Sequence, residues 1–299
     1  MEWMVMVGIL MALMMLASGL AAHAQSQGAD ASSGKTPAAD RLGWRLAVQA
    51  YSFNRYTFYE AVEKTASLGL RHIEAYPGQR LSKEKPDASF DHNMSEELQG
   101  EVKEKLAAAG VTLINYGVVG LGNNEAECRK VFEFAKAMGI ETIVSEPPPD
   151  AMPLLDKLCN EYGINVAIHN HPKPSRYWNP DTVLEACEGC GPRVGACADT
   201  GHWMRSEIGP VEALKKLEGR IVSLHFKDLN ERGQGAHDVP WGTGQGKARQ
   251  MLAELHRQGL KAVFSIEYEY DWDNSLPAIA QCVEFFEQVA GELAAEKKE

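Results

Sequence analysis

Six ionisable side chains stand at the ends of short apolar runs that are spread along the sequence. Burying a carboxylate or an imidazole without a partner costs free energy, so a recurring set of them is hard to explain as isolated core residues. If they converge on one pocket, such a mixture suits a divalent ion such as Mn²⁺, Zn²⁺, Co²⁺ or Mg²⁺. A metal-free acid–base site is the alternative. The residues are Glu74, Glu146, His169, Asp199, His225 and Glu267.

Three neighbouring residues extend this set. Side chains alternate along a strand, so His171 should point the same way as His169 and offer a second imidazole to the same site. His202 follows Asp199 across a short turn, and both could reach one mouth. Lys227 is a candidate electrophile or substrate clamp, because an ammonium stabilises negative charge that develops on oxygen. A solvated loop lysine is the alternative for that residue.

A repeating strand–helix unit carries these residues. From residue 45 a short apolar run is followed by a polar or Gly/Pro loop, and then by a stretch with apolar residues three and four positions apart. Strands are expected at Leu46–Tyr51, His72–Tyr76, Val111–Tyr116, Thr142–Glu146, Asn165–His169, Val194–Asp199, Ile221–Phe226 and Ala262–Tyr268. Helices are expected near residues 57–68, 95–109, 124–138, 150–162, 180–187, 207–218, 246–258 and 275–292.

Eight repeats of this unit predict parallel strands covered by helices, because the strands are too apolar to be half-exposed. Eight such units close a single (β/α)8 TIM barrel, in which active-site residues lie at the C-terminal ends of the strands. An open doubly wound sheet is the alternative. No second folded domain is visible in the sequence.

Composition and charge narrow the class of protein. The chain has 299 residues, of which 44% are hydrophobic and 24% charged, as in globular proteins. Its formal charge of −11 makes a nucleic-acid partner unexpected, because an acidic protein repels a phosphate backbone. Six cysteines are too few for a disulfide scaffold. The lone Cys-x-x-Cys pair, Cys187 and Cys190, is expected to be a disulfide or two free thiols.

The N-terminal residues are expected to lie outside the fold. Val5–Leu20 is an apolar run without charge, and the small-x-small triplet Ala22-His23-Ala24 follows it. This layout predicts a cleaved signal peptide at residues 1–24, a flexible linker at 25–44 and the barrel at 45–299. The protein is then secreted or periplasmic, with no other membrane contact. An uncleaved anchor and a misassigned start are the alternatives.

Several segments resemble the xylose isomerase-like TIM barrel superfamily, the sugar phosphate isomerase/epimerase group. They include Ile168-His169-Asn170-His171, Asp199-Thr200-Gly201-His202, Leu224-His225-Phe226-Lys227-Asp228 and Ser265-Ile266-Glu267-Tyr268-Glu269. Ketose epimerases of this group hold one metal with a Glu, Asp, His, Glu set. The resemblance implies that Asp199, His225 and Glu267 are the last three of these ligands. His169 stands where the first Glu is expected, and Glu146 could supply the missing carboxylate.

These observations give each expected site residue a role. The expected metal ligands are Glu146, His169, Asp199, His225 and Glu267, around one divalent ion. The expected catalytic residues are Glu146, Glu267, His171 and Lys227. The expected substrate-binding residues are Glu74, His202, Trp241 and Tyr268, and the two aromatic residues would offer flat apolar faces to a sugar ring. The glycine-rich segment Gly242–Lys247 lacks the spacing of a phosphate loop and is expected to lie over the mouth of the barrel.

The expected function is that of an exported, metal-dependent sugar isomerase or epimerase. Such an enzyme removes a proton next to a carbonyl of a sugar or a keto-glycoside. A 3-keto-glycoside lyase or hydrolase that acts by elimination is the first alternative. An enzyme that resembles an abasic-site endonuclease and a non-catalytic sugar-binding barrel are the others. The expected partner is a small carbohydrate, and the sequence leaves open whether the chain forms a homo-oligomer.

Overall fold

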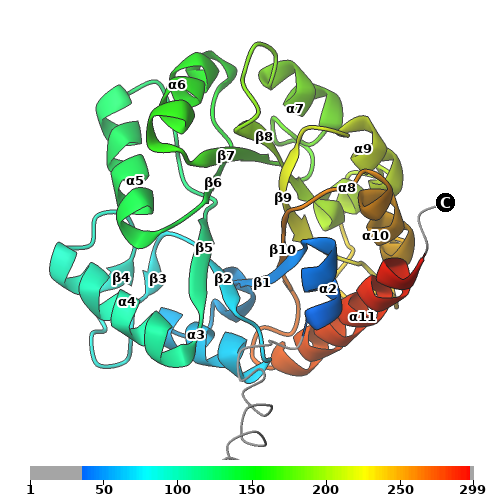
Figure 1. Cartoon of the computed structure of the whole chain (residues 1–299), viewed down its shortest axis with the longest axis horizontal. Helices are drawn as coiled ribbons and strands as arrows, with labels where there is room; N and C mark the ends of the chain where they lie inside the picture. The colour runs from blue at the N-terminus through cyan, green and yellow to red at the C-terminus, as the bar shows by residue number, and fades with distance from the viewer. Residues whose placement is uncertain (1–35, 297–299) are drawn as a thin grey trace, which may run out of the picture. The chain divides into compact units, whose positions relative to one another are not determined.

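Eight parallel strands close into a barrel in the computed structural model, which describes residues 36–296 (Figure 1). Around the barrel the order is β1-β10-β9-β8-β7-β6-β5-β2, so strands that are adjacent in the chain pair with each other. The strands are β1 Arg45–Gln49, β2 His72–Ala75, β5 Thr112–Tyr116, β6 Thr142–Ser145, β7 Asn165–His169, β8 Val194–Asp199, β9 Ile221–Phe226 and β10 Val263–Ile266. The predicted (β/α)8 barrel is confirmed.

Helices form the outer ring that covers this barrel (Figure 1). They are α3 Phe58–Ser67, α4 Glu96–Ala109, α5 Glu125–Met138, α6 Met152–Tyr162, α7 Pro180–Ala186, α8 Thr200–Arg205, α9 Pro210–Lys216, α10 Ala248–Arg257 and α11 Leu276–Ala295. The strand and helix positions agree with the expected ones to within a few residues. The short helix α8 was not expected, nor was the small hairpin of β3 Gln79–Arg80 and β4 Ser89–Phe90.

Local sequence explains where these helices begin and end. Helix α3 begins with a capping box, in which Thr57 and Glu60 each bond the backbone N–H of the other with a side-chain oxygen. Helix α5 ends at Gly139, whose φ of 75° lies in the left-handed region that a glycine adopts without strain. These helix start and stop signals set the lengths of the loops between strands and helices, and the candidate site lies among the loops that follow the strands.

An additional helix, α2 Pro37–Leu42, precedes the first strand and packs on α11. The backbone N–H groups of Ala38 and Ala39 donate to the carboxylate of Glu287 at 2.6 and 3.1 Å. Trp44 is buried, and its ring N–H donates to a backbone carbonyl 2.9 Å away. The folded part therefore begins before residue 45, which corrects the end of the expected linker. The expected signal peptide and the start of the linker lie outside the described residues.

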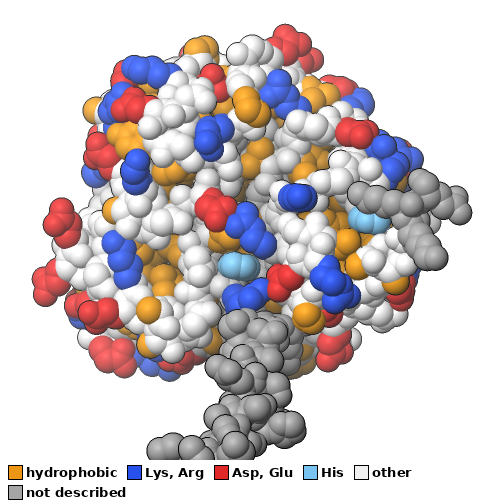
Figure 2. Space-filling view, viewed as in Figure 1, with side chains coloured by type: hydrophobic (Ala, Val, Ile, Leu, Met, Phe, Trp, Pro, Cys, Tyr) orange, Lys and Arg blue, Asp and Glu red, His pale blue; other side chains and the backbone are white. Residues whose placement is uncertain are grey.

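Besides one large apolar cluster, the barrel strands form two small ones, which consist of Ala47, Ile114 and Val263, and of Val144, Ala167 and Cys197. On the face of the molecule seen in Figure 2, basic and acidic side chains lie interspersed, and a histidine side chain lies among them near the centre. Cys187 and Cys190 are both free thiols.

Among residues 36–296, no helix has the length and apolar character needed to cross a membrane.

Candidate active site

Four of the expected residues come together where β7, β8, β9 and β10 end. His169 and Asp199 are the last residues of β7 and β8, His225 is the second-last of β9, and Glu267 directly follows β10. One ligand atom from each lies within 4.8 Å of the corresponding atoms of the others, and all four residues are buried. The expectation that strand ends bring these side chains to one point therefore agrees with the structure.

Each imidazole of this cluster is held by a carboxylate on its far side. Nδ1 of His169 lies 3.1 Å from Glu146, and Nε2 of His225 lies 2.8 Å from Glu74. Because a carboxylate accepts a hydrogen bond from the ring, these contacts orient each imidazole and place an N–H on its outer nitrogen. The inner nitrogens are buried and face the carboxylates of the cluster: Nε2 of His169 lies 3.5 Å from Asp199, and Nδ1 of His225 lies 3.0 Å from Glu267.

Glu74 holds its position through further hydrogen bonds deep in the barrel. Its carboxylate accepts from Ser265 at 2.5 Å, from Gln49 at 3.1 Å and from Asn115 at 3.2 Å, in addition to its contact with His225. The side chain is 0% exposed and does not line the cavity. The structure thus corrects the expected substrate-binding role of Glu74, which orients His225 instead.

Lys227 lies between three carboxylates beside the cluster. Its ammonium is 2.9 Å from Asp199, 2.8 Å from Glu267 and 2.8 Å from Glu269, and the residue is 0% exposed. Burial alone would lower the pKa of Lys227, but these three carboxylates outweigh it and raise the pKa well above its usual value. The ammonium therefore neutralises the carboxylates, and it does not line the cavity as the expected substrate clamp would.

Glu146 connects His169 to His171. Its Oε1 accepts from the backbone N–H of His171 at 3.2 Å and also bonds Nδ1 of that imidazole, while Ser175 donates to Oε2 at 3.1 Å. Burial alone would raise the pKa of Glu146, but the hydrogen bonds from the two imidazoles lower it well below the usual range. Glu146 thus lies behind both rings as their orienting carboxylate.

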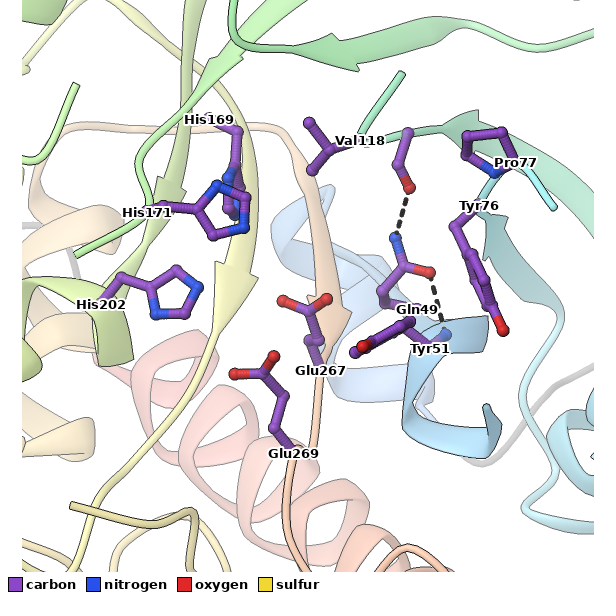
Figure 3. Close-up of a pocket in the computed structure, with 11 residues that line it drawn as sticks. Gln49, Tyr51, Tyr76, Pro77, Val118, His169, His171, His202, Glu267 and Glu269 are labelled. Atoms are coloured by element: carbon purple, nitrogen blue, oxygen red, sulfur yellow. Dashed lines mark hydrogen bonds between the residues drawn. The ribbon is translucent and has the colours of Figure 1, made fainter. Parts of the chain in front are cut away.

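A cavity of about 280 Å³ opens beside the cluster, and its two walls differ (Figure 3). One wall presents imidazole and carboxylate groups, and the other presents two tyrosines with proline, valine and glutamine side chains. The first wall consists of His169, His171, His202, Glu267 and Glu269, and the second includes Gln49, Tyr51, Tyr76, Pro77 and Val118. The cavity thus offers a polar, ionisable side opposite an apolar one.

Comparisons with known proteins agree with this arrangement. The family described as Xylose isomerase-like TIM barrel matches residues 62–289. The chain belongs to this family. Solved structures with this fold include a protein described as a sugar phosphate isomerase/epimerase, 12% identical, and a probable 3-DHS dehydratase, 13% identical, and at these identities they show the fold alone. A comparison with curated proteins found no significant match.

Solved structures of the family superpose over most of the chain. An uncharacterized protein from Parabacteroides distasonis is 31% identical, with a TM-score of 0.68 over 82% of this chain and 99% of that one. A family protein from Mycobacterium smegmatis in complex with magnesium is 15% identical, with a TM-score of 0.67 over 85% and 99%. A D-tagatose 3-epimerase-like protein is 19% identical, with a TM-score of 0.65 over 83% and 99%. At their low identities, the last two show the fold alone.

The four-residue cluster fits the divalent ion that proteins of this family often bind. Two buried imidazole nitrogens and two carboxylates face one point, and both classes of atom ligate such ions. Burial alone would lower the pKa of His225, yet neighbours that include Glu74 and Glu267 raise it well above its usual value. Their electrostatics therefore favour a positive charge at this point.

Two charged residues of the site were missed by the sequence reasoning. Glu269 lines the cavity, and its carboxylate accepts from Lys227 and from Arg205, the latter at 2.7 Å. Arg205 also donates to Nδ1 of His202 at 3.0 Å and to Asp238 at 2.9 Å. Burial, with the nearby cations, lowers the pKa of His202 well below its usual value, so this cavity residue is neutral.

The structure also corrects the expected aromatic residues. Trp241 is 3% exposed and packs against Phe226, with ring centroids 4.6 Å apart, and Tyr268 is 5% exposed. Neither residue lines the cavity, whereas Tyr51 and Tyr76 do. Tyr268 points away because alternate residues of an extended chain face opposite sides, and its neighbours on either side line the cavity.

The glycine-rich segment wraps around a buried carboxylate and does not line the cavity. The backbone N–H groups of Gly242 and Gly244 donate to Oδ2 of Asp228 at 2.9 and 3.0 Å, and that of Gly246 donates to Oδ1 at 2.8 Å. A Cβ atom at Gly244 would overlap this carboxylate and the carbonyl oxygen of Leu229. The close approach that glycine permits here is thus to Asp228.

We therefore expect Gly244→Ala to destabilise the protein by about 1–3 kcal/mol, because the added methyl group overpacks the contact with Asp228. Thermal unfolding followed by circular dichroism measures this as a fall in Tm of about 2–4 °C per kcal/mol. Gly235→Ala is the matched control, since a Cβ there meets nothing within 4 Å. Equal Tm values for the two variants would contradict the assigned packing.

Proposed function

We propose that this chain is a divalent-metal-dependent enzyme that removes a proton next to a carbonyl of a sugar or a keto-glycoside. One observation carries the proposal: His169 and His225, each backed by a carboxylate, direct their buried inner nitrogens toward Asp199 and Glu267, so that four ligand atoms converge on one point. Outer carboxylates that fix the orientation of a histidine are characteristic of metal sites. The adjoining cavity gives a small substrate access to this point.

His169, Asp199, His225 and Glu267 would hold the ion. A bound divalent ion would polarise the carbonyl of the substrate and stabilise the negative charge that develops on its oxygen. Lys227 neutralises the surrounding carboxylates, and neutral His202 can donate a hydrogen bond to a substrate oxygen from Nε2, since Nδ1 accepts from Arg205.

His171 is the proposed base. It lines the cavity, and 49% of its side-chain surface is exposed. Its Nδ1 is hydrogen-bonded to Glu146. This pairing leaves Nε2 free to accept a proton, while the carboxylate stabilises the imidazolium that forms. Glu146 itself is the weaker base, because its pKa is lowered. The proposal thus assigns proton abstraction to His171 and the orientation of that residue to Glu146.

His171→Asn should retain the metal and lose proton exchange at the substrate carbon by a factor of about 10²–10⁴, the usual contribution of a positioned base. Glu146→Gln should cost less, because the imidazole remains while its orienting charge is lost. NMR in D₂O measures the exchange, and isothermal titration with Mn²⁺ provides the control for an intact metal site. Exchange at the wild-type rate in His171→Asn would assign the base to another residue.

We further propose that the substrate is a neutral sugar or keto-glycoside and that the protein acts after export. Among the described residues, no Lys or Arg lines the cavity. The nearby ammonium of Lys227 and guanidinium of Arg205 already form ion pairs with Glu269. A phosphate group would therefore find no free cationic partner there. The apolar run at Val5–Leu20 supports export, and sugar phosphates are intracellular metabolites.

Elimination from a keto-glycoside is the second candidate reaction. After the proton is removed, the electron pair of the C–H bond forms a carbon–carbon double bond and the neighbouring C–O bond breaks. The released alkoxide takes up a proton and leaves as an alcohol. The open cavity favours this candidate, because it leaves room for a substituent that extends from the bound sugar toward the rim.

A further inference from the structure

Two tyrosines that line the cavity, Tyr51 and Tyr76, and a tryptophan that packs on Tyr51 form an aromatic cluster from three segments that are far apart in the sequence. Tyr51 follows β1, Tyr76 follows β2, and Trp272 lies beyond β10. The ring of Tyr51 meets that of Tyr76 at a centroid distance of 5.1 Å and an interplanar angle of 82°, and that of Trp272 at 5.5 Å and 84°. We call these three residues the aromatic rim.

Tyr51 is exposed although it is part of this cluster. With 38% of its surface accessible, it is one of two exposed large hydrophobic residues within the described part of the chain. The other, Tyr270 at 47%, stacks on His237 and does not line the cavity. An exposed aromatic ring that is held by two others at the mouth of a pocket offers a rigid apolar surface to a ligand.

The backbone of Tyr51 is fixed from below by the polar network of the barrel. Its N–H donates to Oε1 of Gln49 at 3.1 Å, and Nε2 of Gln49 donates to the Gly117 carbonyl at 2.9 Å (Figure 3). The same Nε2 also donates to Glu74 at 3.1 Å. Glu74 in turn holds His225. Hydrogen bonds through Gln49 and Glu74 therefore connect Tyr51, the central residue of the aromatic rim, to the candidate metal ligand His225.

The size of the cavity limits what lies against the ionisable wall. Its volume of about 280 Å³ is at the lower end of pockets that take small molecules, which span about 300–1,000 Å³. One sugar ring fills such a space, and a second ring must then lie at the mouth. Tyr51 faces this position from the apolar wall (Figure 3).

The geometry points to a second subsite: the aromatic rim binds a ring-shaped substituent of the substrate, which is a second sugar ring or an aromatic aglycone, by contact with its apolar face. This inference rests on the proposed function, since it takes the ring in the cavity to be the sugar that reacts. It adds a substrate class: the protein should prefer glycosides whose substituent on the reacting sugar contains a ring over free monosaccharides.

The test measures equilibrium binding of three 3-keto-β-glucosides, whose substituents are methyl, phenyl and glucosyl, by isothermal titration to metal-loaded protein that carries His171→Asn, so that the probes are not consumed. With Tyr51 in place, this protein should bind the phenyl or the glucosyl probe at least about tenfold more tightly than the methyl probe, and the probe that gains identifies the kind of ring. Tyr51→Ala should remove this preference, and Tyr51→Phe should retain it because the ring remains. Tyr270→Ala is the matched control and should leave the preference unchanged.

Equal binding of all three probes by the protein with Tyr51 in place would overturn the subsite, as would a preference that survives in Tyr51→Ala. The proposed function fails on a different observation, namely the absence of proton exchange by the wild-type protein in probes that bind. A ring preference that depends on Tyr51, without any exchange, would leave the subsite in place and refute only the proposed reaction.

Discussion

Asp199→Asn is expected to reduce the affinity for Mn²⁺ by more than 100-fold and to abolish proton exchange. The substitution removes a charged ligand from the cluster but keeps Oδ1, which accepts from the backbone N–H of His202 at 2.7 Å and caps helix α8. The fold should therefore persist while the site loses its metal. Isothermal titration measures the affinity, and circular dichroism confirms the fold.

A graded control accompanies this variant. Glu74→Gln keeps all four proposed ligands and weakens only the hydrogen bond that orients His225. It should therefore lower the affinity for Mn²⁺ by about 10–100-fold, as the loss of outer carboxylate partners does. Wild-type affinity in Asp199→Asn would contradict the assigned ligands. A larger loss in Glu74→Gln than in Asp199→Asn would assign Glu74 to the metal itself.

Lys227→Met is expected to tighten metal binding by about tenfold or more while it destabilises the metal-free protein. The ammonium lies within 2.9 Å of Asp199 and within 2.8 Å of Glu267, two of the proposed ligands. Without it these carboxylates repel each other in a buried site, and breaking such a buried ion pair costs about 3–5 kcal/mol. A divalent ion relieves this repulsion. The substitution therefore raises the affinity of the protein for the ion and lowers the stability of the metal-free protein.

Thermal unfolding with and without Mn²⁺ separates these effects. The rise in Tm that the ion causes should be larger for Lys227→Met than for the wild-type protein, because binding to the folded state adds stability in proportion to the logarithm of affinity. Lys157→Met on the exposed surface of α6 is the control, since its ammonium bonds only Glu125 at 3.1 Å. An equal or smaller rise in Lys227→Met would show that Lys227 supports the bound ion.

The barrel and the position of its site could be predicted because both depend on short-range patterns. Apolar runs mark the strands, and parallel strands present their final residues at one end of a barrel. His169, Asp199, His225 and Glu267 are therefore neighbours as soon as the fold is known. The alternation that pairs His171 with His169 also pairs Glu269 with Glu267, and this signal could have identified Glu269.

Other residues could not be assigned from sequence because tertiary packing decides their environment. Trp241 and Tyr51 are both aromatic residues near strand ends, and only the packing buries one against Phe226 and exposes the other. Glu74 stands at a strand end like the ligands, but β2 places it below them, where four donors satisfy it.

The N-terminal helix α2 shows the same limit. Its small residues resemble a linker in composition, yet Ala38 and Ala39 are small because α11 lies against them. The partner that makes them part of the core is more than 240 positions away in the chain.

Deuterium incorporation from D₂O, followed by NMR for methyl 3-keto-β-glucoside, tests the proposed reaction most directly. Metal-loaded wild-type protein should exchange the proton on a carbon next to the carbonyl, and chelation of the metal or Asp199→Asn should abolish the exchange. A sugar phosphate in the same experiment should exchange more slowly, because its phosphate finds no free cation in the cavity. No exchange in the keto-glycoside, or faster exchange in the sugar phosphate, would contradict this account.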